Sequence, residues 1–373
     1  MVTASLGWLQ LAVSGPIILP ILYWIGVRVA NFHESGSGVK DGSRTKVTIL
    51  LPMRNEEKNV IRKLDSIIQE ILEMVDVEIF VIESGSNDGT ADIATNFLEE
   101  SEMKDERWRV VSFPEPGKSL AINKAIGMIN SEIVVMTDSD ANVSPGWMEV
   151  IMERFADEQI GVVSGIEDEV SPGLNRFNKY YRTKSNYLRM RESLVDSTPV
   201  LEGSLIAWDV RKIGKFEIND RINADDAQIG MASIRKGFRS IIDPRIVFQN
   251  FDEKKRSITE SVRRAQGLSI VLVMNADLAI FSIRKRARLA IANAIVLYAI
   301  FPWMVLIFTV NSAFAFCYEP VISANWQFLS IIAILGISTI TSGRMVLIGV
   351  YISLVAHIQI LIGKRHNVWS PIR

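Results

Sequence analysis

Cysteine and histidine are scarce in this chain of 373 residues, and each scarcity excludes a kind of chemistry. The single cysteine, Cys317, excludes an intrachain disulfide and a metal cage built from cysteines. The three histidines are His33, His357 and His366, so none lies between residues 47 and 280. A general base in that region must therefore be a carboxylate or, less commonly, a lysine or tyrosine. The formal net charge of −1 argues against nucleic acid as a partner.

Long apolar runs are present at both ends of the chain, in keeping with a hydrophobic content of 48% and a mean hydropathy of +0.20. Residues 6–27 are nearly uncharged and long enough for a bilayer core, which needs about 20 helical residues. A cleaved signal peptide carries positive charge before its apolar run, whereas the first basic residue here, Arg28, follows the run. An uncleaved anchor is predicted, with its C-terminal side in the cytoplasm.

Two further apolar regions lie near the C-terminus. Residues 290–316 follow the basic run 284–288, which marks the cytoplasmic side of a predicted span. Residues 326–363 are too long for one span and are interrupted at 342–344, so two segments are expected there. Three crossings would place the basic tail outside, whereas a re-entrant segment, or a hairpin at Gly15-Pro16, would return it to the cytoplasm.

These patterns predict an integral protein of the cell membrane with a cytoplasmic central domain that meets the lipid bilayer. The predicted division is a transmembrane helix at 1–31, a Gly- and Ser-rich linker at 32–45, a cytoplasmic domain at 46–270, an interfacial basic segment at 271–288, transmembrane helices at 289–363 and a tail at 364–373.

Between the anchors, β-rich runs alternate with helical periodicity. This alternation predicts an α/β fold with a mostly parallel, doubly wound sheet. Ligands of such sheets bind beyond the carboxyl ends of the strands, where this chain has Glu83 and Asp138. The predicted strands are residues 47–52, 77–83, 107–113 and 132–138, and the predicted helices are residues 56–75, 90–98 and 119–129.

The stretch T-D-S-D-A at 137–141 is the strongest chemical signal. It follows a run too apolar to be a loop, and it places Asp138 and Asp140 at a strand end. Two carboxylates there form an oxygen-only site suited to Mg²⁺ or Mn²⁺ bound to a diphosphate. The alternative is a polar turn, since aspartates two residues apart are common by chance.

Other motifs have both a functional and a plain structural interpretation. Acidic residues in 52–59 suit the start of a helix, Asp88 can cap the next helix, and Lys118 can be a solvated loop lysine. Gly117 and Lys118 also begin a helix, where free N–H groups and a cation favour phosphate. Asp225 and Asp226 can cap a helix, and the basic helix at 257–267, with Arg263 and Arg264, can lie on anionic headgroups.

Taken together and in this order, the motifs resemble those of family 2 glycosyltransferases, the membrane-anchored kind with a GT-A domain, over roughly residues 46–270. The groups that the chain resembles include ceramide glucosyltransferases, poly-N-acetylglucosamine synthases and polyprenyl-phosphate mannose synthases. Such enzymes use a nucleotide-sugar donor and Mn²⁺ or Mg²⁺.

The resemblance implies a role for individual residues. Asp140, with Asp138, is the metal ligand, Asp226, with Asp225, is the catalytic base, and Arg263 binds the diphosphate. The nucleobase and ribose of the donor contact the ends of the first two strands, and Asp88 and Lys118 help to shape that pocket. The implied nucleotide-sugar-binding residues are Pro52, Arg54, Asn55, Glu56, Glu83, Ser84, Asp88, Gly117, Lys118, Asp138, Gly203 and Arg263.

The chain departs from the family pattern in three places. Glu83-Ser84 stands where two aspartates are usual, Glu260 replaces a glutamine, and Arg264 replaces a tryptophan that borders the acceptor sugar in processive synthases. Loss of that tryptophan favours transfer of one sugar, with inversion, to a lipid-linked or saccharide acceptor, and the pair Asp225-Asp226 favours an acceptor hydroxyl, whose proton a base must remove. The expected donor is a UDP-sugar, since UDP is the family's commonest donor nucleotide. A polyprenyl phosphate sugar synthase, a processive polysaccharide synthase and an inactive nucleotide-sugar-binding membrane protein stay open as alternatives.

Overall fold

The computed structural model describes residues 18–30, 45–74, 76–103, 105–172, 174–251, 257–318 and 340–364. The first part of the predicted N-terminal anchor, nearly all of the linker, the segment 326–339 and the tail from 365 lie outside the described residues.

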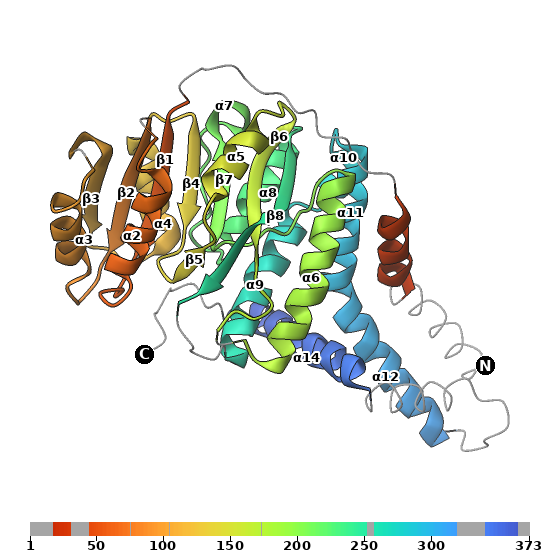
Figure 1. Ribbon diagram of the computed structural model, residues 1–373. Coiled ribbons are helices and arrows are strands. Elements are labelled where there is room, and N and C mark those ends of the chain that lie inside the picture. The colour runs from red at the N-terminus through yellow and green to blue at the C-terminus, as the bar shows by residue number, and fades with distance from the viewer. Residues whose placement is uncertain are drawn as a thin grey trace.

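An eight-stranded mixed sheet forms the centre of the chain, in the order β3-β2-β1-β4-β7-β6-β8-β5 (Figure 1). Strands β3, β2, β1 and β4 pair in parallel, and β6 pairs in parallel with β8. Strand β7 is antiparallel to both β4 and β6, and β5 is antiparallel to β8. The predicted α/β fold with a mostly parallel sheet is confirmed. The strands are β1 Val47–Met53, β2 Val77–Ser84, β3 Trp108–Phe113, β4 Ile133–Thr137, β5 Ala141–Val143, β6 Ile160–Glu167, β7 Leu205–Asp209 and β8 Arg239–Asn250.

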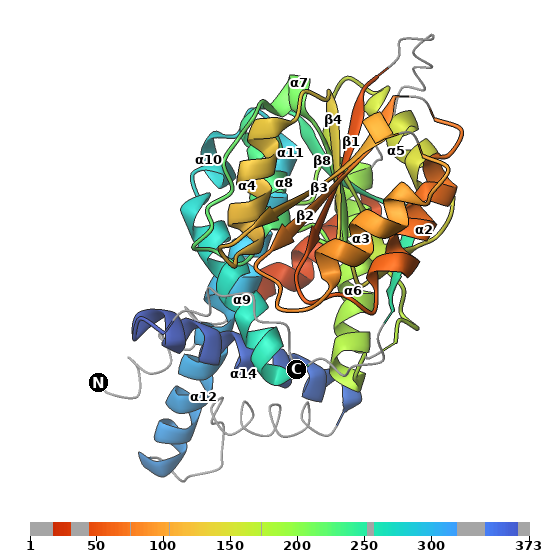
Figure 2. The same cartoon turned by 90° about the vertical axis from the view of Figure 1, so that its left-hand side faces the viewer.

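Helices cover both faces of the sheet, which explains why its central strands are continuous apolar runs. Figure 2 shows α2, α3 and α5 on one side of the sheet and α4 and α8 on the other. Two separate hydrophobic clusters lie on these two faces. We call this sheet and its helices the sheet domain. Its helices are α2 Val60–Ile71, α3 Thr90–Glu99, a short 3-10 turn at Asp105–Arg107, α4 Lys118–Met128, α5 Trp147–Phe155, α6 Arg176–Val195, α7 Val210–Ile213 and α8 Asp225–Arg235.

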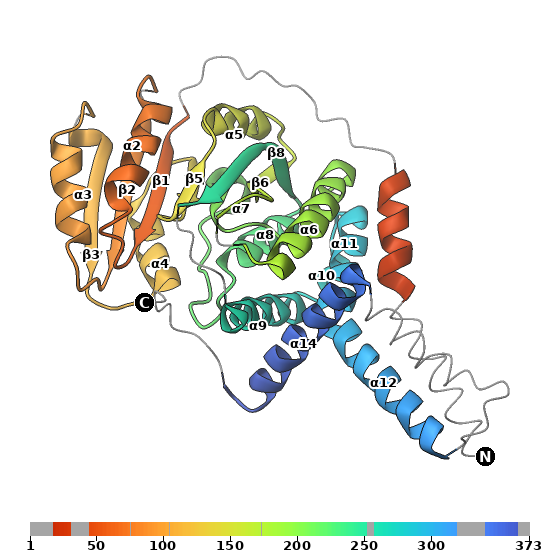
Figure 3. The same ribbon diagram turned by 60° about the horizontal axis from the view of Figure 1, so that its bottom comes forward.

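In the view of Figure 1, α10 and α11 lie beside the sheet domain, and α9, α12 and α14 lie below it. Figure 3 shows α14 crossing α9 beside α12. Two stretches, Lys285–Ala313 and Thr341–Leu361, are long and apolar enough to cross a membrane, and Ile18–Val29 is a shorter apolar helix. The helices are α9 Ile258–Met274, α10 Leu278–Phe281, α11 Lys285–Ile295, a π-helical turn at Val296–Ile300, α12 Phe301–Tyr318 and α14 Thr341–Leu361.

Helix α11 forms the first part of the apolar stretch Lys285–Ala313, which overlaps the membrane span predicted to start at residue 290. Ala290, Ile291 and Ala294 are at most 4% exposed. Ile291 and Ala294 belong to one hydrophobic cluster with Met231 of α8 and Leu272 of α9. The apolar side chains at 290–294 are therefore buried against protein, because α11 runs alongside the sheet domain before the chain continues into α12.

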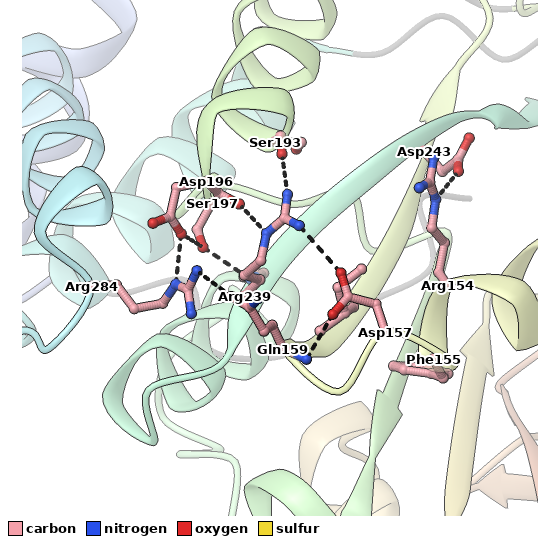
Figure 4. Close-up of polar contacts among 12 residues, drawn as sticks. Arg154, Phe155, Asp157, Gln159, Ser193, Asp196, Ser197, Arg239, Asp243 and Arg284 are labelled. Carbon is pink, nitrogen blue, oxygen red and sulfur yellow. Dashed lines mark hydrogen bonds and ion pairs between the residues drawn. The ribbon is translucent and has the colours of Figure 1, made fainter. Parts of the chain in front are cut away.

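Arg284, the first residue of the basic run 284–288, attaches the start of α11 to the sheet domain, and Figure 4 shows its side chain beside Asp196. Arg284 Nε donates to Asp196 Oδ1 at 2.7 Å, and its Nη1 donates to Gly237 O at 3.2 Å. Gly237 precedes β8, so these contacts lie at the edge where β6 and β8 start. That edge is opposite the carboxyl end of β4, since β6 and β4 are both antiparallel to β7. The interfacial role of residues 271–288 stays a prediction.

Candidate active site

The turn after β4 presents Asp138 and Asp140 at the carboxyl edge of the sheet. The Asp138 N–H donates to Ser204 O at 3.1 Å, and the Phe251 N–H donates to Asp140 O at 2.7 Å. The turn is therefore fixed through its backbone by chain segments from β7 and β8. Both aspartate residues stay partly exposed, so their carboxylates face the edge where ligands of such sheets bind.

Lys118, the first residue of α4, connects this turn to the start of α8. Its Nζ lies 2.7 Å from Asp138 Oδ1 and 3.0 Å from Asp225 Oδ2. Burial opposes the charge of Lys118, but the two carboxylates raise its pKa above the ordinary value. Burial likewise opposes ionisation of Asp225, but the Lys118 charge lowers the pKa of Asp225. Lys118 and Asp225 are therefore both charged. The sequence predicted that Lys118 shapes the nucleobase pocket, but it did not indicate that Lys118 bridges Asp138 and Asp225.

Asp226 follows Asp225 in the first turn of α8 and differs from it in its proton affinity. Burial and the charge of Asp225 raise the pKa of Asp226 to about 6. The backbone N–H of Ala227 donates to Asp226 Oδ1 at 2.7 Å. A Cβ built on Gly203 would lie 3.6 Å from Asp226 Oδ2, so the two residues are neighbours. The site thus contains one carboxylate with low and one with high proton affinity.

Arg263 reaches the same site from α9. With the Asn223 amide oriented so that its oxygen faces the guanidinium, Arg263 Nε and Nη1 both donate to it at 3.2 Å. Burial and the neighbouring charge of Arg264 lower the pKa of Arg263. Within the described residues Arg263 has no carboxylate at ion-pair distance, although Asp225 and Asp138 act on it electrostatically. The site therefore contains a guanidinium available for an anion.

The close approach of α9 depends on Gly267. A Cβ at this position would lie 2.1 Å from Asn223 O, a distance that no side chain tolerates. Helix α9 therefore crosses the segment before α8 in direct contact with its backbone, which places Arg263 beside Asn223. Sequence reasoning noted Gly267 only as part of a pattern, because nothing local indicates that a distant carbonyl lies against it.

The loops after β1 and β2 form a second group of predicted residues at the same edge. The Asn55 N–H donates to Ser86 Oγ at 3.0 Å, and the Asn87 N–H donates to Asn55 Oδ1 at 2.8 Å. Glu83, 6% exposed, accepts from the Ser86 N–H. Asn55 has a φ of +55°, the only non-glycine with positive φ among the described residues. Hydrogen bonds thus connect the two loops, and they hold Asn55 in an unusual backbone conformation.

Asp88 has the plain structural role that its sequence context also allowed. Its Oδ1 accepts from the Thr90 N–H at 3.1 Å, at the start of α3, and its Oδ2 accepts from the Glu57 N–H at 3.4 Å. Glu56 N–H donates to Thr90 Oγ1 at 2.9 Å. Pro52 lies in β1, beside Ile82 of β2. A contact of these residues with a nucleotide stays a prediction.

The donor set fits a hard divalent cation. Among the described residues, no group of three or more His, Cys, Asp or Glu side chains could enclose a metal ion. Asp138 and Asp140 would therefore supply two carboxylates, and water and phosphate oxygens would supply the rest. This division suits Mg²⁺ and Mn²⁺, which keep several waters and bind through one or two carboxylates plus phosphate.

The two residues that depart from the family pattern in α9 pair with each other. Arg264 Nη2 donates to Glu260 Oε1 at 3.0 Å, and the Glu260 N–H donates to Ser257 Oγ at 3.1 Å. Ser257 and Glu260 thus have the spacing of a capping box at the helix start. These side chains stabilise the start of α9, with Arg264 exposed.

Comparison with known proteins agrees with the resemblance of the sequence motifs to family 2 glycosyltransferases. Residues 48–215 match the family described as Glycosyl transferase family 2. The glycosyltransferase GlyA of Streptococcus pneumoniae is 24% identical over 212 residues, which cover 55% of this chain and 29% of GlyA. The glycosyltransferase AglE of Haloferax volcanii is 24% identical over 148 residues, which cover 40% of this chain and 47% of AglE. The chain thus matches less than half the length of either curated relative.

A solved structure resembles nearly the whole chain. The mannosyltransferase PcManGT from Pyrobaculum calidifontis, solved in complex with GDP-Man and Mn²⁺, superposes with a TM-score of 0.78 at 22% identity. The likeness covers 96% of this chain and all of that one. At this identity it shows a shared fold of the GT-A kind, including the arrangement of helices after the sheet domain.

Proposed function

We propose that this chain, whose residues 48–215 form a glycosyl transferase family 2 domain, transfers a sugar from a nucleotide-sugar to a lipid-linked or saccharide hydroxyl. One observation carries the proposal: Lys118 lies 2.7 Å from Asp138 and 3.0 Å from Asp225, so it connects the proposed metal turn to the residue directly before the proposed base, Asp226. Residues far apart in the sequence thereby form one polar site at a sheet edge.

Four charged residues of this site, Asp138, Asp140, Asp226 and Arg263, have a role in the proposed transfer. Asp140 and Asp138 would hold a divalent cation, which would neutralise charge on the departing nucleoside diphosphate. Arg263 has a guanidinium available for the diphosphate oxygens, which it would bind in a bidentate manner. Asp226 accepts the proton of the acceptor hydroxyl as its oxygen attacks the anomeric carbon from the face opposite the diphosphate. The product therefore has the inverted configuration.

The position of α14 supports an acceptor presented at a membrane. Helix α9, which places Arg263 in the site, packs along α14. Gln266 Nε2 donates to Gln359 Oε1 at 2.8 Å, and Ser269 Oγ lies 3.0 Å from His357 Nε2. Helix α14, which is among the described helices apolar enough to cross a membrane, therefore lies next to α9, which contains Arg263, the residue proposed to bind the diphosphate. A lipid-borne head group could reach the site from this side.

The nucleobase of the donor stays a proposal, with uracil and guanine as the two candidates. UDP is the commonest donor nucleotide in the family that the motifs resemble, whereas the mannosyltransferase with the similar fold was solved with GDP-Man. Thermal stabilisation of the purified protein by UDP- and GDP-sugars, each with Mn²⁺ or Mg²⁺, distinguishes them. Stabilisation by neither donor would contradict the proposed nucleotide-sugar site.

Asp226→Asn tests the reaction itself. Loss of a positioned base lowers turnover by about 10²–10⁴-fold, so we expect that loss in nucleoside diphosphate release, while Mn²⁺-dependent donor binding remains. The matched control is Asp277→Asn, on an exposed aspartate far along the chain, which should leave turnover unchanged. Near-normal turnover of Asp226→Asn would exclude Asp226 as the base and would favour a phosphate acceptor, which needs none. Donor binding without turnover in the wild type would indicate an inactive binding protein.

A further inference from the structure

Helix α2 has a lysine in its buried stripe. The residues that face the sheet from this helix are Val60, Lys63, Leu64, Ile67 and Ile71, at the spacing of a helix core face. Lys63 is 1% exposed, so its ammonium group is inside the sheet domain rather than in water. Burial of an ammonium group is costly unless it is well bonded.

The partners of Lys63 lie at the two ends of the proposed metal turn. Its Nζ donates to Thr137 Oγ1 at 2.8 Å and to Ala141 O at 2.6 Å. Thr137 is the last residue of β4, and Ala141 is the first residue of β5. The ammonium group thus spans the base of the turn that contains Asp138 and Asp140.

The hydrogen bonds continue from Thr137 toward the proposed base. Thr137 Oγ1 donates to Ser204 O at 2.8 Å, and Ser204 follows Gly203, the neighbour of Asp226. Burial lowers the pKa of Lys63 to about 7, whereas the charges of Asp138 and Asp140 oppose this shift. Lys63 therefore lies under the turn, within the electrostatic reach of both carboxylates.

We propose that Lys63 is a positioning residue that fixes the turn 137–141 in the geometry that binds the divalent cation, an inference that rests on the proposed function. Loss of the ammonium group leaves the Ala141 carbonyl without this donor, and a buried carbonyl that loses its donor moves to find another. The two carboxylates then move with the turn, and a metal site tolerates displacements of only about 0.5 Å.

Two lysine variants test this proposal. Lys63→Met keeps an unbranched chain of similar length but removes both hydrogen bonds. The matched control is Lys212→Met, because Lys212 Nζ also donates to main-chain carbonyls, those of Asp157 at 3.0 Å and Ile160 at 2.7 Å, at the opposite edge of the sheet. Free Mn²⁺ is measured by electron paramagnetic resonance as the full-length protein is titrated in the presence of UDP and, separately, of GDP.

We expect Lys63→Met to weaken Mn²⁺ binding about tenfold or more, as changes behind metal ligands commonly do, and Lys212→Met to bind Mn²⁺ as the wild type does. Raised Mn²⁺ should restore turnover of Lys63→Met, with the KM for acceptor unchanged. Thr137→Val should weaken Mn²⁺ binding in the same direction and keep the protein folded if Lys63→Met does not fold, whereas Thr137→Ser should not weaken it.

Wild-type Mn²⁺ affinity in both Lys63→Met and Thr137→Val, or tighter binding, would overturn the positioning role while the proposed metal site stands. Equal loss of Mn²⁺ affinity in Lys212→Met would show a general effect of instability and would also overturn it. Absence of Mn²⁺ binding by the wild type would overturn both this inference and the metal site of the proposed function.

Discussion

At the scale of single residues, the pair Asp225-Asp226 has unequal proton affinity. Lys118 lowers the pKa of Asp225, whereas burial and the charge of Asp225 raise the pKa of Asp226 to about 6. Because a general base must be ionised, we expect kcat/KM to fall as pH drops through about 6. Asp225→Asn removes one cause of the raised pKa and should shift this fall to lower pH, as pH–rate profiles of both proteins will show. An unchanged acid limb in that variant would contradict the assignment.

The same shift has a consequence for stability. A carboxyl group whose pKa is raised by folding destabilises the folded state above its folded pKa, and this cost disappears as pH falls from about 6 toward the ordinary value of 3.8. Asp226→Asn should therefore raise the melting temperature at pH 8 and leave it unchanged near pH 4. A gain that is equal at both pH values would show that the Asp226 charge is not its cause.

Single residues differ in how far the sequence reveals them. The position of Asp138 and Asp140 at the edge of the sheet could be predicted, because they directly follow an apolar strand and a local sequence pattern reveals such a strand. Lys63 could not, although a lysine on an apolar helix face is visible in the sequence, because its partners Thr137 and Ala141 lie in two strands, β4 and β5, far along the chain from α2. Contacts between residues far apart in the chain are decided by packing.

At the scale of elements, α9 and the segment before α8 touch through Gly267. A Cβ there would lie 2.1 Å from Asn223 O, so Gly267→Ala must push α9 away and with it Arg263. We expect weaker binding of the nucleoside diphosphate product, measured by calorimetry, and a lower melting temperature. The matched control is Gly127→Ala in α4, where a Cβ would meet nothing within 4 Å. That change should stabilise the protein by about 0.5–1 kcal/mol. Unaltered product binding in Gly267→Ala would exclude this contact as the cause of Arg263 placement.

The strands and the first helices of the sheet domain agree with their predicted positions, within a few residues at the ends. Buried parallel strands give continuous apolar runs, and α3 and α4 have clear starts. The start of α2 was predicted too early, because residues 57–59 form a turn in which the Asn59 N–H donates to Glu56 O at 2.8 Å. The predicted span at 290–316 overlaps the apolar stretch Lys285–Ala313, whose first part, α11, also packs against protein, since burial against protein and burial in lipid select the same apolar residues.

At the scale of the whole molecule, Arg284 links the C-terminal helices to the sheet domain (Figure 4). The side chains of Arg284 and Asp196 are only 14% and 11% exposed. Removal of one partner from a buried ion pair costs about 3–5 kcal/mol, so Arg284→Met should clearly lower the melting temperature of the detergent-solubilised protein. The matched control is Arg235→Met, whose pair with Asp277 is exposed and should matter little. Equal melting temperatures of the two variants would contradict this role of Arg284.

The backbone hydrogen bonds of the turn at 138–140 join it to segments that are synthesised after the turn. One partner, Ser204, lies well after the turn, and the other, Phe251, comes later still. A nascent chain that ends after β5, at Val143, contains both carboxylates but neither Ser204 nor Phe251. The backbone hydrogen bonds that fix the proposed metal turn are therefore complete only once Phe251, directly after β8, has emerged from the ribosome, so we expect a chain stalled before that point to lack a formed site.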